Sequence, residues 1–376
     1  MRKYLTISFL VVSTIVHSQM INSSSIMSVA QGTTLGIDMD FLNTGTLKNK
    51  GDIFLTGNWM NVGVYDSAGG QLIFSSTEVQ QIINNGQEIN NLVIRNGIKT
   101  LNDDLTITGE LSLNSAILQV EGDAKLILGQ DAIISGASEN AYINGTLYRV
   151  GTGDLFYPIG TQSDYLPVTL KEVLGFKPEI GMKAFSDPPF QKIGDNLQEF
   201  ASDSYWQLFS TDSYASGFIE LPYENVVDIR RLVVAQATSE SSLYNTLGSS
   251  QVDGDQTAGV VTSEGNAFGI YFTLALAPES SPLPPLKIIN VVTPLQDGKH
   301  DFLRIENIEL YPDNKVEIFD RHGNKVFSLS NYNNRDRVFV GEPNHGISGQ
   351  LPDGNYFYTI KTGRTKITSG FLFLKR

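Results

Sequence analysis

The chain contains no cysteine. Disulfide bonds, thiolate nucleophiles, cysteine metal sites and the lipid-modified cysteine of a lipoprotein are therefore excluded. Histidine is scarce as well: after His17 only His300, His322 and His345 occur. Residues 19–285 thus lack the base that a Ser-His-Asp triad needs. The catalytic patterns GxSxG and HExxH and a Walker phosphate loop are also missing.

Long hydrophobic runs are missing everywhere except at the start. Met1–Lys3 is basic and Tyr4–Val16 is mostly apolar, but this run is shorter than the roughly 18 residues of a membrane-spanning helix. The pattern predicts a secretory signal peptide, residues 1–18, cleaved between Ser18 and Gln19. An N-terminal anchor helix is the alternative. We expect no transmembrane helix in the mature chain.

Charge is distributed unevenly along the rest of the chain. Gln19–Pro285 contains 12 basic and 30 acidic residues, a net charge of −18, whereas Leu286–Arg376 contains 13 and 10, a net charge of +3. The acidic part lacks the clustered Lys and Arg that nucleic-acid binding requires. A soluble extracellular surface explains this acidity more simply than a cationic partner does. The change of sign indicates a domain boundary.

A proline-rich stretch, APESSPLPPLK, lies at this boundary. Four prolines in eleven residues cannot continue a helix or a central strand, so residues 278–286 are predicted to form an extended linker. Amphipathic helical spacing is hard to find before or after it. Short alternating stretches such as DLTITG, ELSLN and KLILGQD, bounded by Gly, Asn and Asp, instead predict strands and an all-β fold.

The strand pattern divides the chain into regions. Residues 19–150 carry short, loosely repeated strands and are predicted to form a β-solenoid, with an irregular sandwich as the alternative. Residues 151–277 have longer strands rich in aromatic residues, which predict an antiparallel β-sandwich. Residues 287–376 form a separate C-terminal module. Its last segment, FLFLKR, places Phe371 and Phe373 on one face of a strand and Leu372 and Leu374 on the other.

The C-terminal module contains an ordered set of motifs. They are TPLQDGKHD from Thr293 to Asp301, YPDNKVEIFDRHG from Tyr311 to Gly323, Asn331-Tyr332 followed by Phe339 and Gly341, LPDGNYFY from Leu351 to Tyr358, and Gly370 followed by Leu374, Lys375 and Arg376. The residues with the clearest correspondence are Thr293, Pro294, Asp297, Gly298, Asp301, Tyr311, Pro312, Arg321, Gly323, Leu351, Pro352, Asp353, Gly354, Tyr356, Tyr358, Gly370, Lys375 and Arg376. In LPDG, proline presets φ for a turn and Asp-Gly supplies a left-handed position, after which the aromatic residues begin a strand.

These motifs resemble the gliding motility-associated C-terminal domain, the type B sorting domain of proteins exported by the type IX secretion system. The solenoid-like strands and the following LFYPIG are similar, more diffusely, to N-terminal parts of large Bacteroidota surface proteins. The resemblance implies an Ig-like β-sandwich. Because both faces of the last strand are apolar, we expect that strand to be buried or to await a partner, as a docked edge of the sandwich. The resemblance also implies that the module is recognised by the type IX machinery and an associated outer-membrane protein. An ordinary Ig-like domain is the alternative.

The opening loop departs from the family pattern. Leu295, Gln296 and His300 replace Asn, Gly and Asn, and His322 replaces the Trp of R-W-G. Asp297 and Asp301 are the candidate Ca²⁺ ligands, but about six oxygen donors are not visible around them. We therefore favour a hydrogen-bonded turn at this loop and expect no metal.

Two other groups of residues are candidate functional sites. His300, His322 and His345 lie 22 and 23 residues apart, which is not a zinc-ligand spacing, so loop histidines are expected. Asp253 and Asp255 are candidates for a catalytic carboxylate pair, although a surface turn explains them better.

The sequence thus predicts a non-enzymatic secreted or cell-surface protein without a cofactor. A structural or adhesive role, with a link to gliding and a surface glycan or matrix ligand, follows from the resemblance. The alternative is an extracellular carbohydrate-active enzyme that uses paired carboxylates in the N-terminal β regions.

Overall fold

The computed structural model describes residues 18–67, 69–187, 192–211, 213–279, 283–346, 349–362 and 366–376. Its secondary structure is 55% strand and 2% helix, so the predicted all-β class is confirmed. The chain divides into two compact units, residues 1–148 and residues 149–376. The predicted signal peptide lies outside the described residues except for Ser18, and Gln19 begins the first strand. No helix in the described ranges is both long and apolar enough to span a membrane.

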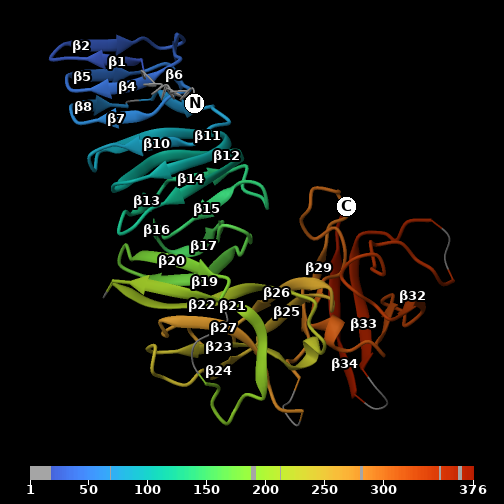
Figure 1. Cartoon of the computed structure of the whole chain (residues 1–376). Coiled ribbons are helices and arrows are strands. Elements are labelled where there is room, and N and C mark those ends of the chain that lie inside the picture. The colour runs from blue at the N-terminus through green and yellow to red at the C-terminus, as the bar shows by residue number, and fades with distance from the viewer. Residues whose placement is uncertain are drawn as a thin grey trace, which may run out of the picture. The chain divides into compact units, whose positions relative to one another are not determined.

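The first unit is a β-solenoid of about 7 turns, as predicted (Figure 1). Its strands pair in parallel with those of the neighbouring turns. They are β1 (Gln19–Asn22), β2 (Ile26–Val29), β3 (Thr34–Ile37), β4 (Asp40–Asn43), β5 (Thr46–Asn49), β6 (Asp52–Leu55), β7 (Trp59–Asn61), β8 (Val64–Asp66), β9 (Gln71–Phe74), β10 (Gln80–Ile83), β11 (Glu88–Leu101), β12 (Leu105–Val120), β13 (Leu126–Leu128), β14 (Ile133–Ser135), β15 (Tyr142–Asn144) and β16 (Leu147–Val150), which runs across the boundary of the units.

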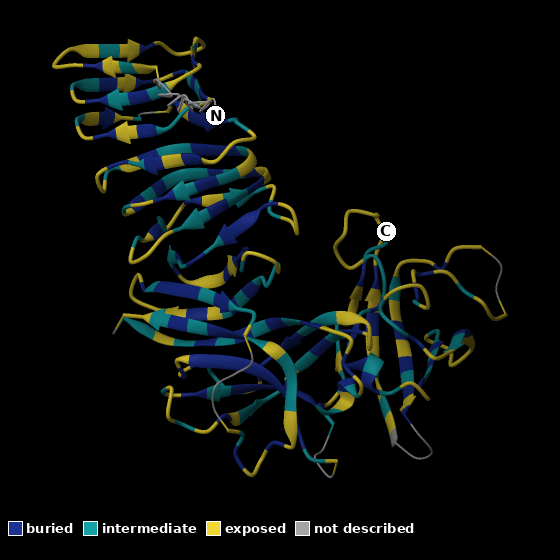
Figure 2. Cartoon of the chain, in the orientation of Figure 1, coloured by how far each residue is buried: buried dark blue, intermediate teal, exposed yellow. Residues whose placement is uncertain are grey.

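Apolar side chains form continuous rows inside the solenoid. One row stacks a single side chain from each of five turns, every one of them buried: Ile37, Leu55, Phe74, Ile94 and Leu113. The alternation of inward apolar and outward polar residues produces these rows, because successive side chains of a strand point to opposite faces. Figure 2 shows buried and exposed stretches alternating along the strands. A single turn could not bury its apolar face, so stacking stabilises the whole unit.

A ladder of buried asparagines runs beside the apolar rows. Asn22 donates to Asn43 Oδ1 and Asn43 donates to Asn61 Oδ1, each over 2.7 Å. Asn61 then donates to Asn84 Oδ1 over 3.2 Å, and the indole of Trp59 donates to the same oxygen over 3.0 Å. Buried amides must be hydrogen-bonded. The ladder therefore fixes the register of successive turns, since a slip would leave these groups unpaired.

The second unit begins with two antiparallel sets of five strands, which pair in the orders β20-β21-β27-β23-β24 and β17-β19-β22-β26-β25. Contacts of β22 with β27 and of β23 with β26 join the sheets, which is consistent with the predicted sandwich. The elements are β17 (Gly153–Tyr157), β18 (Ile159–Gly160), β19 (Val168–Gly175), β20 (Glu179–Phe185), β21 (Glu199–Ser210), β22 (Tyr214–Glu224), η1 (Ile229–Arg231), β23 (Leu232–Ala237), β24 (Asn245–Gly248), β25 (Gln251–Gly254), β26 (Ala258–Thr262) and β27 (Tyr271–Leu276). All six side chains of β27 are buried, so this strand is central to the layer.

The C-terminal part of the second unit is built on a five-stranded sheet, β29-β34-β33-β31-β32, and a two-stranded pair, β28-β30. The elements are β28 (Lys287–Ile288), β29 (Val291–Val292), β30 (Ile305–Glu306), η2 (Ile308–Leu310), β31 (Lys315–Phe319), β32 (Lys325–Ser330), β33 (Gly354–Thr362) and β34 (Lys366–Leu374). We refer to residues 286–376 as the C-terminal domain. The sheets are consistent with a sandwich, and the Ig-like topology stays a prediction.

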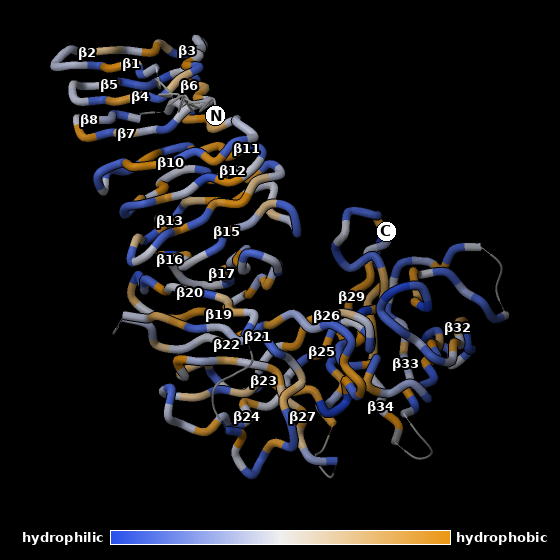
Figure 3. Tube along the Cα trace, viewed as in Figure 1, coloured by the Kyte–Doolittle hydropathy of each residue, from blue (hydrophilic) through white to orange (hydrophobic). Residues whose placement is uncertain are grey.

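The position of the final strand differs from the prediction. β34 pairs with β33 on one side and with the short parallel strand β29 on the other, so the prediction of an edge is wrong. The predicted faces are correct, because Leu372 and Leu374 are fully buried whereas Phe371 and Phe373 are exposed. Figure 3 shows the corresponding concentration of hydrophobic residues along the strands and of hydrophilic residues in the loops.

Candidate functional site

The opening loop of the C-terminal domain is a hydrogen-bonded turn closed by its two aspartates. Asp301 accepts the backbone N–H of Gln296 on Oδ1 over 2.7 Å and that of Gly298 on Oδ2 over 2.8 Å. Asp297 Oδ1 accepts the N–H of Lys299 over 2.9 Å. Gln296 and Gly298 both adopt left-handed backbone angles, with φ of 56° and 80°. The carboxylates therefore organise the turn itself, and the described residues contain no group of three or more His, Asp or Glu placed to hold a metal ion.

The ends of this loop are tied together by Thr293. Its N–H donates to His300 O over 2.7 Å and its hydroxyl donates to Lys299 O over 3.2 Å. Pro294 follows, and Leu295, which replaces a polar residue of the family pattern, is exposed at the surface. The loop thus keeps its closed form without the amide that the family pattern has at this position.

The second motif places a buried tyrosine at the centre of the domain. Asn314 donates to Tyr332 O over 2.9 Å and accepts the N–H of Tyr332 over 2.8 Å. The hydroxyl of Tyr332 donates to Leu303 O and accepts the N–H of Phe339 over 3.0 Å. One side chain therefore joins three loop segments, which explains why an Asn-Tyr pair and a following aromatic residue belong to the pattern.

The beginning and end of the same motif have other roles. Tyr311 donates its hydroxyl to Pro284 O over 2.8 Å and so ties the linker to the domain, with Pro312 following it. At the other end, Asp320 Oδ1 accepts the N–H groups of His322 and Asn324 and forms the tip of the β31-β32 hairpin. Gly323 has a φ of 83° at this tip. Arg321 is exposed there and donates to His322 Nε2 over 3.2 Å.

The LPDG and G-x-x-x-L-K-R motifs meet across the β33-β34 pair. Tyr358 and Gly370 are register partners, and a Cβ added to Gly370 would lie 2.4 Å from the Tyr358 hydroxyl oxygen. Any larger residue at position 370 would therefore have to displace this ring. Leu351 is buried at the start of the motif, and Tyr356 donates to Pro352 O over 2.8 Å.

The two cations that end the chain are exposed, as predicted, but Arg376 is held in place. Its guanidinium donates to Gly341 O over 2.7 Å and to Leu351 O over 3.2 Å, and its backbone N–H donates to Asp353 Oδ1 over 3.0 Å. Gly354, next in the turn, has a φ of 151°. The backbone N–H of Lys375 donates to Val292 O over 3.0 Å, which continues the β29-β34 pairing. The end of the chain is thus fastened to two of the domain's own motifs and to β29.

The three histidines lie in separate loops of the C-terminal domain. His300 closes the opening loop, His322 lies at the hairpin tip, and the N–H of His345 donates to Val326 O over 3.1 Å. The described part of the chain brings none of them into a metal-binding group.

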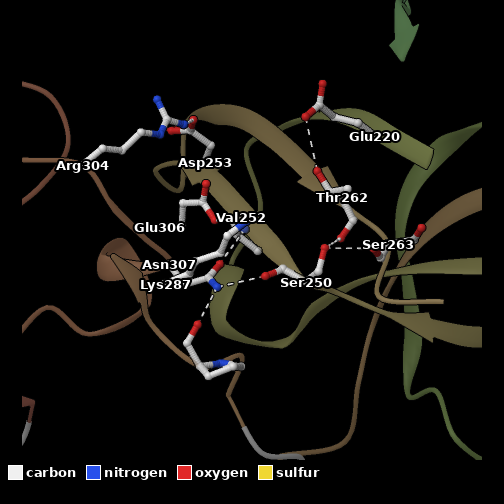
Figure 4. Close-up of polar contacts among 11 residues, drawn as sticks. Glu220, Ser250, Val252, Asp253, Thr262, Ser263, Lys287, Arg304, Glu306 and Asn307 are labelled. Carbon is white, nitrogen blue, oxygen red and sulfur yellow. Dashed lines mark hydrogen bonds and ion pairs between the residues drawn. The ribbon is translucent and has the colours of Figure 1, made fainter. Parts of the chain in front are cut away.

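Asn307 has a structural role that no sequence motif indicates (Figure 4). Its side chain is buried at the junction between the sandwich and the C-terminal domain. The amide oxygen accepts the N–H of Val252 over 2.9 Å, and the amide nitrogen donates to Ser250 O over 2.9 Å and to Pro285 O over 2.8 Å. Its left-handed φ of 66° is a conformation that Asn tolerates well. No motif surrounds it, so only the structure could reveal this role.

Two ion pairs extend the same junction. Asp253 binds Arg304 and Asp255 binds Arg335, so each candidate carboxylate of the sandwich meets a cation of the C-terminal domain. Backbone hydrogen bonds from Thr257 and Ala258, together with Arg335, lower the pKa of Asp255. A general acid needs a raised pKa. The two carboxylates are therefore partners in a junction. At this junction, acidic residues of the sandwich bind basic residues of the C-terminal domain.

A cavity of about 690 Å³ lies beside the ion pair of Asp255 and Arg335. Its lining includes Asp228, Arg230, Asp255, Glu309 and Arg335. Burial raises the pKa of Glu309 to about 7. Oε1 of Glu309 accepts two hydrogen bonds from Asn334, of 3.1 and 2.9 Å, whereas Oε2 is buried without a hydrogen-bond partner among the described residues. Glu309 thus holds the loop that contains Asn334. The neighbouring carboxylates, Asp228 and Asp255, are bound by arginine.

The comparisons with known proteins agree with the location of the motifs. Residues 286–374 match the family model described as CHU_C Type IX secretion signal domain. The chain matches no curated protein and no solved structure. The C-terminal domain, with its closed opening loop, its central tyrosine and its fastened last strand, is a type IX secretion signal domain, and it marks the chain for export to the cell surface or the medium.

Proposed function

We propose that this chain is a non-enzymatic structural or adhesive protein of the outer cell surface, delivered there by its C-terminal domain. The secretion signal implies an interaction with the type IX machinery. Retention at the surface, a glycan or matrix ligand, an associated outer-membrane protein and a role in gliding are parts of this proposal.

The repeated outward rows of the solenoid carry the proposal. Ile26, Thr46 and Val64 occupy equivalent outward positions on β2, β5 and β8. Ser28, Lys48 and Asp66 likewise stand in one row. Stacked repeats of this kind present extended surfaces on which the same weak contact can recur along a polymeric ligand. A repetitive surface with a filled interior supports a spacer or adhesin better than it supports a single catalytic centre.

Removal of residues 286–376 tests delivery. We expect the truncated chain to remain in the periplasm of a Bacteroidota host with a working type IX system, while the full chain reaches the surface or the medium. Cell fractionation measures the difference, and a host without the system is the control. Export of the truncated chain would contradict the delivery part of the proposal.

Removal of residues 19–148 behind an intact signal peptide tests adhesion separately. We expect the shortened chain to reach the surface at a level similar to that of the full chain, since the secretion signal is unchanged. Attachment of the cells to polysaccharide-coated and protein-coated surfaces should fall. Unchanged attachment at equal surface levels would reject an adhesive role for the solenoid.

The alternative function, an extracellular carbohydrate-active enzyme, is favoured by one observation. The cavity near Glu309 combines a carboxyl group of raised pKa with carboxylates of lowered pKa, Asp228 and Asp255, and glycosidases use such a split. Against it, the lowered carboxylates are bound by Arg230 and Arg335. We expect no release of reducing sugar from polysaccharides by the full chain. Hydrolysis that disappears in Glu309→Gln would establish the enzyme instead.

A further inference from the structure

We propose that the outer face of the five-stranded sheet in the C-terminal domain is the surface that binds a protein of the export machinery. The binding site on that partner is an apolar pocket bordered by acidic residues. We call this surface, formed by Val291, Lys315, Phe319, Lys325, Phe357, Lys361, Ile367, Phe371 and Phe373, the phenylalanine face. The inference rests on the proposed export function and adds to it the location of the contact.

Three phenylalanines stand in one row across three neighbouring strands. Phe319 on β31 is the register partner of Phe357 on β33, and Phe357 is the register partner of Phe371 on β34. Phe373 lies two residues further along β34, and Val291 on β29 is its register partner. The exposed fractions of Phe357, Phe371 and Phe373 are 50%, 57% and 41%. The apolar side chains therefore form a continuous patch at one end of the sheet.

Folding of the domain does not require these side chains to be apolar. The opposite face of β33 and β34 already supplies the core, with Tyr356, Tyr358, Ile360, Leu372 and Leu374 packed inside. An antiparallel sheet with one solvated face normally alternates apolar and polar residues. A strand that is apolar on both faces thus carries an exposed patch that its own fold does not cover, and such patches mark interaction sites.

The charges on the same face select an acidic partner. Lys315 and Lys361 are direct register partners on β31 and β33, an arrangement in which like charges repel each other. Glu317 binds Lys315 over 2.9 Å and Lys325 over 2.7 Å, so two of the three lysines on this face share one carboxylate. Carboxylates on a partner would relieve this excess of positive charge.

The same observations argue against other occupants. In a twofold dimer this face would meet its own copy, which has more lysines than carboxylates and so could not relieve the excess of positive charge. Phenylalanine has no polar tip, whereas Tyr and Trp are typical of the membrane interface because each has one. A pocket on a protein partner would bury the phenylalanine rings most completely.

The buried motif residues support this location. Tyr332 and Leu351 are almost fully buried, and the chain end is held by Arg376. A receptor cannot touch residues inside the core, so it recognises what the motifs position. The motifs hold β33 and β34 in register, and this register aligns the phenylalanine row.

Export of the double variant Phe357→Ser/Phe371→Ser tests the inference in the full chain. We expect the exported fraction to fall by about tenfold or more, since central aromatic residues dominate interface energies. The matched control Phe176→Ser/Phe268→Ser changes two exposed phenylalanines of the sandwich and should be exported like the wild type. Unfolding midpoints of the purified proteins establish that both variants fold.

A second variant, Lys315→Glu/Lys361→Glu, tests the charge argument without touching the rings and should reduce export by a smaller factor. Normal export of the phenylalanine variant, with the wild type also exported, overturns the inference and leaves the export function intact. Failure of the wild type to be exported overturns the export function itself. Self-association of the purified wild type, or binding to vesicles of anionic lipid, that is lost in the phenylalanine variant would assign the face to a second copy or to a membrane and overturn the protein partner.

Discussion

The solenoid and the C-terminal domain are both built from β-strands, yet their interiors are organised in opposite ways. In the solenoid, the side chains of one row, such as Leu55 and Phe74, have the same surroundings above and below. In the C-terminal domain, Tyr332 and Asn307 each make a set of hydrogen bonds that does not recur at a neighbouring position of the same strand or loop. Equivalent positions tolerate exchange of one apolar residue for another, whereas unique positions do not.

This difference determines how far the loss of stability caused by a substitution extends through each region. In a stack of repeats, each turn contacts only its neighbours, so stability is approximately a sum of local terms. In a small domain with one core, unfolding is cooperative. A substitution in the solenoid should therefore weaken a few turns, whereas a substitution at the centre of the C-terminal domain should weaken all of it.

The largest effect is expected from Trp59→Ala in the solenoid. Trp59 is fully buried, stacks on Phe41 at 5.2 Å, meets Tyr65 edge-on, and binds Asn84. Its removal should cost about 3–5 kcal/mol of unfolding free energy, as other buried Trp truncations do. Hydrogen-exchange mass spectrometry should show faster exchange in residues 40–85 and an unchanged second unit. Faster exchange spread evenly over the solenoid would mean that its turns unfold together.

An intermediate effect is expected from a substitution of Lys99. This residue is charged, unlike the apolar residues Leu118 and Ile143 in the same row of the solenoid. Lys99 is buried in register with Leu118 and Ile143, and its ammonium donates to Ser76 O and Asn96 O, each over 2.6 Å. Burial lowers the pKa of Lys99 from 10.5 to about 8. Between these two values the unfolded chain binds more protons than the folded one, so stability should rise with pH across this window, by on the order of 3 kcal/mol.

Lys99→Met should remove this rise, at the pH-independent cost of the two carbonyls that lose their donor. Chemical denaturation of the wild type and the variant between pH 7.5 and 10.5 measures the difference. Lys48→Met, at an exposed position of the same solenoid, is the control and should keep the wild-type slope. Parallel pH profiles for the wild type and Lys99→Met would show that the ammonium is solvated.

The same contrast explains what the sequence could predict. The motifs of the C-terminal domain are recognisable because residues such as Gly370 beneath Tyr358 and Asp301 in its turn each have a specific local role. In the solenoid, the sequence shows only an alternation of apolar and polar residues. This alternation predicts the class of fold but not the role of any individual residue. Lys99 was not foreseen, because a buried lysine in a strand looks like an exposed one.

Long-range geometry accounts for the remaining differences. The pairing of β29 with β34 joins residues about eighty positions apart, and two residues of β29 carry too little pattern to predict it. For the same reason the last strand was predicted to be an edge. Asn307 and the arginines at its junction depend on contacts over 51 to 80 positions, which a single sequence does not encode locally.

The smallest effect is expected from Tyr332→Phe, which removes one oxygen from the centre of the C-terminal domain. The change leaves Leu303 O and the N–H of Phe339 buried and unpaired, which should cost about 1–3 kcal/mol. Because this domain has one core, the loss should appear as a uniform decrease in protection over all its strands. Tyr356→Phe, whose hydroxyl binds Pro352 O in a partly buried position, is the matched control and should cost less. Protection lost only around Leu303 and Phe339 would mean that the domain yields locally, like the solenoid, and would remove the contrast in cooperativity between the two regions.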